Sequence, residues 1–320
     1  MRYGEDDRES DNVEDRRGQG GPMFPFPGGG GRTVQIPLTG GSLGTLLVIG
    51  LILWAMGINP LELLSEGNFP QVQLPQSEQQ ERPGPAARRS PTDIPGLPGG
   101  TAVNTEDDMK RFVSQVLADT EDVWTREFAS IGKKYVDPQM VLFTDATRTA
   151  CGVGVAAMGP FYCPLDRKVY IDLAFYDQLK RRFNAPGDFA QAYVIAHEVG
   201  HHVQNLLGIL PKVQQAQRAS SDRAQSNHLQ VQVELQADCF AGVWANHAEA
   251  QKQFLDPGDI DAALQTASAI GDDTLQRKAQ GTVVPDSFTH GSAEQRRRWF
   301  STGFKEGTIK ACNTFAAARL

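Results

Sequence analysis

The residues with the clearest chemical meaning lie in one short stretch, Ala196-His-Glu-Val-Gly-His-His202. On a helix, residues i and i+4 share a face, so His197 and His201 can direct imidazole nitrogens at one ion about 2.0–2.1 Å away. Glu198 turns toward the open coordination position, where it can act as general base toward a metal-activated water. The apolar residues before the motif predict a buried helix, in which histidine and glutamate are costly unless paired or metal-bound. The pattern therefore predicts a catalytic zinc site with one Zn²⁺ per chain.

A catalytic zinc needs a third protein ligand, and a second motif offers one. Glu234 and Asp238 are four residues apart in a stretch with helical, partly apolar character, so they share a helix face. We expect Glu234 to be the third ligand and Asp238 to accept a hydrogen bond from the far nitrogen of a ligand histidine. His228 and His247 are alternative ligands, and solvated helix carboxylates are the alternative interpretation of the pair.

Peptide hydrolysis also needs a donor for the oxyanion, and His290 is the candidate. Ser292 and Gln295 form a capping-box pattern, which predicts a helix start just after His290 and a loop that presents its side chain. Arg296 is expected to support it. The alternative is a turn histidine before a basic, solvated helix.

Four cysteines occur in 320 residues, and none forms the CxxC pattern of a zinc ribbon. Outside the cytoplasm two disulfides are reasonable, and three pairings are possible. We favour the local pair Cys151–Cys163 together with Cys239–Cys312. Four buried free thiols are the alternative.

The first hundred residues divide into three segments by composition. Residues 1–37 alternate acids and arginines and then become rich in glycine and proline, which predicts a disordered tail. Residues 38–60 carry no charge and are long enough to predict a transmembrane helix. Residues 61–100 are rich in proline and glutamine, as in an extended spacer.

Arginines lie before the apolar segment, and the next basic residue after it is Arg82. The positive-inside rule then predicts a cytoplasmic N-terminus and a periplasmic or extracytoplasmic domain on a single-pass membrane protein. A cleaved signal peptide is the alternative, since Ala55-Met56-Gly57 is a weak cleavage site. The net charge of −7 is spread along the chain without a basic block, which argues against a nucleic-acid partner.

Residues 101–320 predict one α+β domain, because a helix precedes a small sheet and helices follow it. A helical pattern starts near Thr105 and ends at Gly132. Strands are expected at 141–143, 151–157 and 168–173, a helical stretch up to Phe183, and a long helix from Asp188 to about Leu207. Most of the remaining chain is expected to be helical.

Four motifs together resemble the "putative neutral zinc metallopeptidase" family of bacteria, whose members combine a disordered N-terminus, one membrane span and a C-terminal domain. The four motifs are His197-Glu-Val-Gly-His-His-Val-Gln204, Glu234-Leu-Gln-Ala-Asp-Cys-Phe-Ala-Gly-Val-Trp244, Gly159-Pro-Phe-Tyr-Cys-Pro164 and Thr289-His-Gly-Ser-Ala-Glu-Gln-Arg296.

The paired HExxH and ExxxD motifs are also similar to those of gluzincins, including the membrane CAAX proteases. This resemblance implies a zincin-like domain with His197, His201 and Glu234 as ligands, Glu198 as base and Asp238 as the partner of a ligand histidine. In the CAAX-protease relatives a histidine and an arginine follow at the spacing of His290 and Arg296, but Gly291 stands where proline is usual. The resemblance also implies substrate binding to an edge strand, for which residues 152–161 are the candidate.

The leading hypothesis is therefore a zinc-dependent endopeptidase acting on a peptide or protein. A membrane-anchored zinc-binding scaffold or interaction domain without catalytic activity is the alternative. Structural zinc sites are usually closed and rich in cysteine, whereas this one offers an open position beside a glutamate, which favours the enzyme.

Overall fold

The computed structural model describes residues 1, 3–4, 7–18, 105–176 and 188–320 of the chain, with helix α3 described in its backbone alone at residues 105 and 106. The described residues up to 18 and from 109 onward belong to one compact unit. The predicted transmembrane helix at 38–60 and spacer at 61–100 lie outside the described residues, as does the end of the helical stretch expected to reach Phe183. In the described part of the chain, no helix is both long and apolar enough to cross a bilayer.

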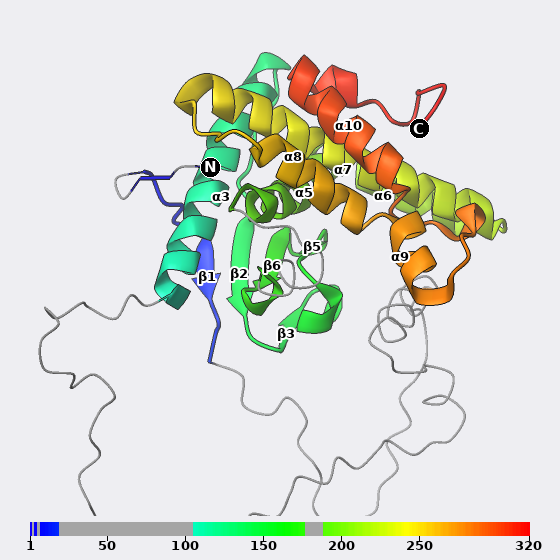
Figure 1. The fold of residues 1–320 in the computed structure, drawn as a ribbon, viewed down its shortest axis with the longest axis horizontal. Coiled ribbons are helices and arrows are strands. Elements are labelled where there is room, and N and C mark those ends of the chain that lie inside the picture. The colour runs from blue at the N-terminus through cyan, green and yellow to red at the C-terminus, as the bar shows by residue number, and fades with distance from the viewer. Residues whose placement is uncertain (2, 5–6, 19–104, 177–187) are drawn as a thin grey trace, which may run out of the picture. The chain divides into compact units, whose positions relative to one another are not determined.

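A four-stranded sheet forms one layer of this unit, in the order β1-β2-β6-β5 (Figure 1). Strand β2 pairs in parallel with β1 and β6, whereas β5 pairs antiparallel with β6. The strands are β1 Val13–Asp15, β2 Gln139–Phe143, β5 Phe161–Cys163 and β6 Lys168–Asp172.

Strand β2 is apolar from Met140 to Phe143, as expected for a strand that is covered on both faces. Met140 and Leu142 belong to the large core shared with the helices. Val141 and Phe143 belong to a smaller cluster on the other face, with Cys163 and Tyr170. The sheet is therefore buried at its centre and is held directly against the helical layer.

A separate two-stranded sheet joins β3, Ala146–Thr149, to β4, Gly152–Val155, in antiparallel register. The 3-10 turn η1, Ala156–Met158, then leads toward β5. Of residues 152–161, only Phe161 therefore lies in an outer strand of the main sheet. That strand is β5, which packs against the helix that carries the HExxH motif.

Seven helices make up the rest of the described unit, with two short 3-10 turns among them (Figure 1). Their bounds are α3 Thr105–Ser130, α5 Asp188–Leu206, α6 Ile209–Ala219, α7 Arg223–Lys252, α8 Asp259–Ala269, α9 Asp272–Gln280, η2 Pro285–Ser287, α10 Ala293–Glu306 and η3 Ile309–Cys312.

Two glycines let the central helices approach closely. A Cβ added at Gly200 on α5 would lie 3.0 Å from the carbonyl oxygen of Ala237 on α7. A Cβ at Gly303 on α10 would collide with the carbonyl of Cys239 on α7. The glycine inside the HExxH motif therefore brings α7, with Glu234, within reach of the two histidines.

The α+β class, mostly helical with a small sheet, agrees with the prediction. Both favoured disulfides, Cys151–Cys163 and Cys239–Cys312, form in the structure. The prediction of disorder over 1–37 is wrong for residues 7–18, because β1 completes the sheet and its neighbours pack on α3. Residues 19–37 lie outside the described part.

Candidate metal centre

His197, His201 and Glu234 converge where α5 crosses α7. The Nε2 atom of His197 lies 3.2 Å from Oε2 of Glu234, and Nε2 of His201 lies 3.7 Å from the same oxygen. One ligand atom from each residue can be chosen so that all lie within 4.8 Å of one another. His197 and Glu234 are buried and His201 is nearly so.

These separations fit a zinc ion. Two nitrogen or oxygen ligands at about 2.0–2.1 Å from a tetrahedral ion lie about 3.3–3.4 Å apart. The spacing between His197 and Glu234 is already close to that value, and the spacing between His201 and Glu234 is a few tenths of an ångström longer. The three ligand atoms span up to 4.8 Å, so the group would contract around a bound ion. The donor set of two imidazoles and one carboxylate leaves a fourth position for water or substrate, as catalytic zinc sites do.

The far nitrogens of both histidines are held by other side chains, which directs each Nε2 toward the centre. Nδ1 of His197 lies 2.9 Å from Oδ1 of Asp238, the partner that the i, i+4 spacing predicts. Nδ1 of His201 lies 2.9 Å from Oε1 of Gln204, one turn further along α5. Because both acceptors need a proton on Nδ1, the two Nε2 atoms are the ones free to bind a metal.

Asp238 is fully buried, and four hydrogen bonds converge on its carboxylate. Besides His197, the donors are Tyr193 Oη at 2.5 Å, Arg296 Nη2 at 2.9 Å and Arg296 Nε at 2.8 Å. Arg296 also donates to the Tyr193 hydroxyl at 3.2 Å. The expectation that Arg296 supports His290 is therefore wrong: its hydrogen bonds run to Asp238 and Tyr193, under His197.

Gln204 is in turn fixed by two acceptors. Its Nε2 donates to the carbonyl of Val233 at 2.7 Å and to Oε1 of Gln236 at 3.1 Å. Gln236 donates to the carbonyl of Cys312, whose disulfide with Cys239 ties the C-terminal segment to α7. A chain of buried amides thus connects His201 to a covalent crosslink, so the imidazole has little freedom to turn.

Charges in the metal-free centre are strongly coupled. Burial alone would lower the pKa of His197, but Asp238 and Glu234 outweigh it and raise that pKa to about 10. Burial would raise the pKa of Glu234, yet His201 and His197 bring it well below its ordinary value. Without a metal ion, the His197 imidazolium therefore lies beside the Glu234 carboxylate. A bound metal ion would take the place of the proton on that imidazolium.

Glu198 occupies the position after His197 on α5 and is buried, and its carboxyl interacts electrostatically with His197, His201 and Glu234. Burial raises the pKa of its carboxyl above the ordinary value, although His197 and His201 oppose the shift. A glutamate with a raised pKa is suited to take a proton and release it again near neutral pH.

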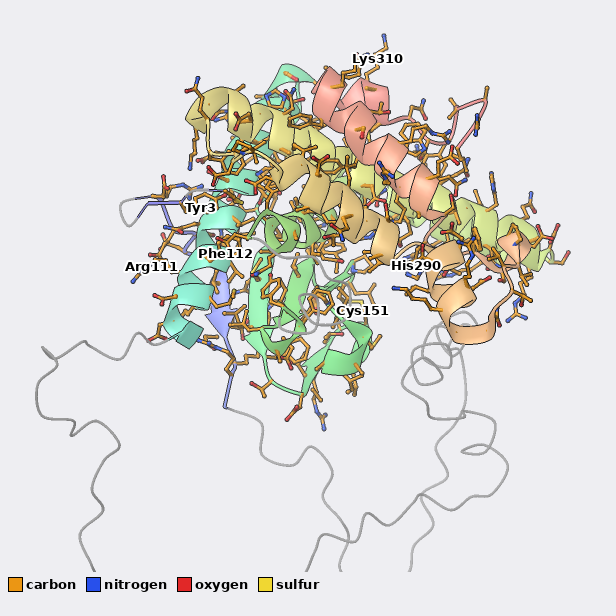
Figure 2. All side chains as sticks on the ribbon, viewed as in Figure 1. Tyr3, Arg111, Phe112, Cys151, His290 and Lys310 are labelled. Atoms are coloured by element: carbon orange, nitrogen blue, oxygen red, sulfur yellow. A yellow bond between two sulfur atoms is a disulfide. The ribbon has the colours of Figure 1, made fainter. Side chains whose placement is uncertain are left out.

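His290 is presented from the loop before α10, whose first turn has the predicted capping box of Ser292 and Gln295 (Figure 2). Its anchor is Asp272, the first residue of α9. Oδ2 of Asp272 accepts from the backbone N–H groups of residues 289–291, at 2.6–3.0 Å, and Oδ1 lies 3.2 Å from His290 Nδ1.

Burial would lower the pKa of His290, but Asp272 and then Glu234 reverse the direction and raise it. With Nδ1 turned to Asp272, the Nε2 nitrogen of His290 is the one that can meet a substrate. Asp272, Tyr193 and Gln204 were not singled out from the sequence, although all three hold the centre in shape.

The remaining histidines have other contacts. His202 is fully buried, and its Nε2 lies 2.7 Å from the carbonyl of Val136 while its Nδ1 lies 3.0 Å from the Tyr162 hydroxyl. His247 Nε2 bonds the carbonyl of Gly307 at 2.8 Å, and His228 is exposed. Among the described residues, the cluster that could hold a metal contains Glu234 and neither His228 nor His247, the two alternative third ligands.

One relative matches nearly the full length of this chain, and another matches about two thirds of it. The uncharacterized protein YpfJ of Escherichia coli (strain K12) is 48% identical over 309 residues, covering 96% of each chain. An uncharacterized protein of Mycobacterium tuberculosis (strain ATCC 25618 / H37Rv) is 41% identical over 223 residues, covering 67% of this chain and 74% of its own.

No solved structure matches. A family model described as "Putative neutral zinc metallopeptidase" matches residues 1–315. With two histidines and a glutamate gathered at the crossing of α5 and α7, the chain belongs to that zinc metallopeptidase family.

Proposed function

We propose that this protein is a zinc-dependent endopeptidase that hydrolyses bonds in a peptide or protein, with the zincin-like site expected from its motifs. One observation carries the proposal: candidate ligand atoms of His197, His201 and Glu234 converge, and the buried carboxyl of Glu198 interacts electrostatically with all three without belonging to the group. A structural site has little use for that fourth group, whereas a hydrolytic site needs it.

In this mechanism the protein residues divide the work. A bound zinc would polarise the scissile carbonyl and acidify a water molecule. Glu198 accepts the proton of that water and passes it to the leaving amine, for which its raised pKa suits it. His290, whose pKa is raised by its hydrogen bond to Asp272, donates from Nε2 to the oxygen that gains negative charge.

Substrate is proposed to bind in extended form along β5, the outer strand of the main sheet on the side of α5. In strand addition, hydrogen bonds to the backbone of β5 would provide affinity, and contacts with the substrate side chains would determine specificity. Tyr162 on β5 bonds to His202 of α5, which fixes the distance between this edge and the metal helix.

The test compares the full chain with Glu198→Gln, using a mixed peptide library read by mass spectrometry and zinc counted in the same samples. We expect about one zinc in each protein and a loss of turnover of at least ~10³-fold in the variant, because the proton acceptor is removed. Glu294→Gln is the matched control, since Glu294 is exposed and pairs with the exposed Arg319 at 3.3 Å. Cleavage by Glu198→Gln at the parent rate would refute the mechanism.

A second outcome would favour a different class of protein. If the parent holds one zinc but cleaves no member of the library, and Glu198→Gln behaves identically, the domain is better described as a zinc-binding scaffold. If the parent holds no zinc, the proposal fails at its first requirement.

A further inference from the structure

Residues 7–18 form an integral part of the folded unit, although 86 residues separate them from the next described segment. Strand β1 pairs in parallel with β2, with Val13, Glu14 and Asp15 in register with Met140, Val141 and Leu142. The backbone N–H of Met140 donates to the carbonyl of Asn12, and that of Arg16 to the carbonyl of Leu142, both at 2.8 Å.

The same segment packs along α3. Ser10 is buried, its N–H donates to the carbonyl of Ser114, and its hydroxyl donates to Glu121 at 2.5 Å. Asn12 reaches the same carboxylate oxygen at 2.8 Å. In Figure 2, Tyr3 lies beside Phe112 of α3, and their ring centroids are 6.0 Å apart.

Charges on β1 are matched to the neighbouring elements. Glu14 accepts from Lys168 of β6 at 2.9 Å, and Asp15 lies 3.3 Å from Lys110 of α3. Hydrogen bonds from Arg16 first, and from Lys168 as well, lower the pKa of Glu14 to about 2. Backbone pairing, a buried serine and cross-element ion pairs together make this contact specific.

We infer that residues 7–18 and the metallopeptidase domain lie on the same side of any membrane. Strand pairing and a hydrogen bond to α3 require the two segments to be in direct contact, which a bilayer of ~30 Å hydrocarbon between them forbids. The chain from residue 19 to residue 104 therefore begins and ends in one compartment. A single crossing by residues 38–60, with a cytoplasmic N-terminus and an outside domain, is incompatible with β1 in its place in the sheet.

The sequence carries two signals about the compartment, and they disagree. Basic residues before the apolar segment favour a cytoplasmic tail, whereas the two disulfides favour an oxidising compartment for the domain. With β1 paired to β2, both signals apply to one compartment, and only one of them can be right. The inference does not depend on catalysis, so it stands or falls separately from the proposed peptidase activity.

The test uses a membrane-impermeant maleimide on intact cells that make the full chain, with labelled peptides identified by mass spectrometry. One variant carries Glu9→Cys in the N-terminal segment, and another carries Lys212→Cys on α6; both parent side chains are exposed. The unaltered chain gives the background from native thiols. We expect the two positions to behave alike, either both labelled in intact cells or both labelled only after lysis. Labelling of one position in intact cells and of the other only after lysis would overturn the inference.

A neighbouring pair of residues tests the docking itself. Ser10 is 6% exposed, whereas the adjacent Glu9 is exposed. In the native full chain, Ser10→Cys should react at least ten times more slowly than Glu9→Cys, and the two rates should become equal in denaturant. Equal rates in the native protein would mean that the segment is not bound to α3, and would remove the basis of the inference. Because serine and cysteine have similar size, Ser10→Cys is expected to leave the fold intact, which its melting temperature checks.

Discussion

The guanidinium of Arg296 and the carboxylate of Asp238 form a bidentate pair beneath the candidate metal centre, with bonds of 2.8 and 2.9 Å. Both side chains are almost completely buried, at 3% and 0% exposed. The same carboxylate holds Nδ1 of His197. The pair therefore links the orientation of one metal ligand to the stability of the α7–α10 interface.

Removing the arginine should destabilise the fold strongly. Arg296→Ala leaves Asp238 as a buried carboxylate without its main countercharge, and breaking such a pair costs about 3–5 kcal/mol. We expect the free energy of unfolding, measured by urea titration, to fall by that amount. Arg297→Ala, one residue along α10 at an exposed position, is the matched control and should change it by less than ~0.5 kcal/mol. A similar small change in both variants would mean that the pair carries no such energy.

Gln204 should affect zinc binding more than it affects folding. Gln204→Met keeps the size of the side chain but removes the acceptor that orients His201 Nδ1. Loss of such an outer partner typically weakens metal affinity by about 10–100-fold. The dissociation constant for zinc can be measured by competition with a chromophoric chelator.

Gln232→Met separates this effect from a general loss of stability. Gln232 is also buried on α7 and donates to a backbone carbonyl, that of Thr314 at 3.3 Å, but it does not contact the histidines. We expect its zinc affinity to stay within about twofold of the parent, because no outer partner of a ligand is lost. Equal weakening in both variants would assign the effect to packing.

The sequence could indicate which residues come together at the candidate centre because their geometry is local. Positions i and i+4 of a helix always share a face, so His197 with His201 and Glu234 with Asp238 could be paired before any fold was known. Tyr193 and Gln204 carry the same kind of signal, since they lie four residues before His197 and three after His201. No such helical spacing indicates a role for Asp272, because its contact with His290 joins α9 to a loop 18 residues later.

The N-terminal strand was missed for a different reason. Only Val13 in β1 is apolar, so the segment lacks the hydrophobic alternation that identifies most strands. Its charges do alternate in the manner of a strand: Arg16 pairs with Glu14 and Arg17 with Asp15, each two residues apart on one face. A pattern that resembles a disordered polar tail was in fact a short strand whose partners lie more than 100 residues away.

Asp272 should act on the reaction through His290. Asp272→Asn keeps an oxygen for the backbone N–H groups but removes the charge that raises the pKa of His290. If His290 works as a cation, activity falls as pH rises through its pKa, so the alkaline limb of the kcat/KM profile should move to lower pH in the variant. Asp273→Asn is the control, because Asp273 accepts from the backbone of Ala293 at 2.7 Å without contacting His290. A profile that keeps its shape in Asp272→Asn would contradict this role.

His202 should make the fold sensitive to acid. Burial lowers its pKa to about 4, Arg167 adds to that effect, and the Val136 carbonyl opposes it. Its contacts suit the neutral ring: Nε2–H donates to Val136, and Nδ1 accepts from Tyr162.

Because the folded pKa lies below the ordinary value of about 6.5, the unfolded chain binds the proton first as pH falls. Stability contributed by the neutral ring is complete above pH ~6.5, decreases between pH ~6.5 and ~4, and is lost below. Between pH 7.5 and 4.5 this single residue should account for about 2–3 kcal/mol of the lost free energy of unfolding.

The measurement compares urea unfolding of the metal-free parent and His202→Gln at both pH values, so that the titration of the metal ligands cancels. Glutamine can donate to Val136 and accept from Tyr162 without titrating, so the variant should lose less stability on acidification than the parent. His228→Gln, at an exposed histidine, should follow the parent. If His202→Gln and the parent lose the same free energy between the two pH values, the buried ring is not the acid-sensitive element, and the sensitivity must come from groups outside the contact between α5 and β5.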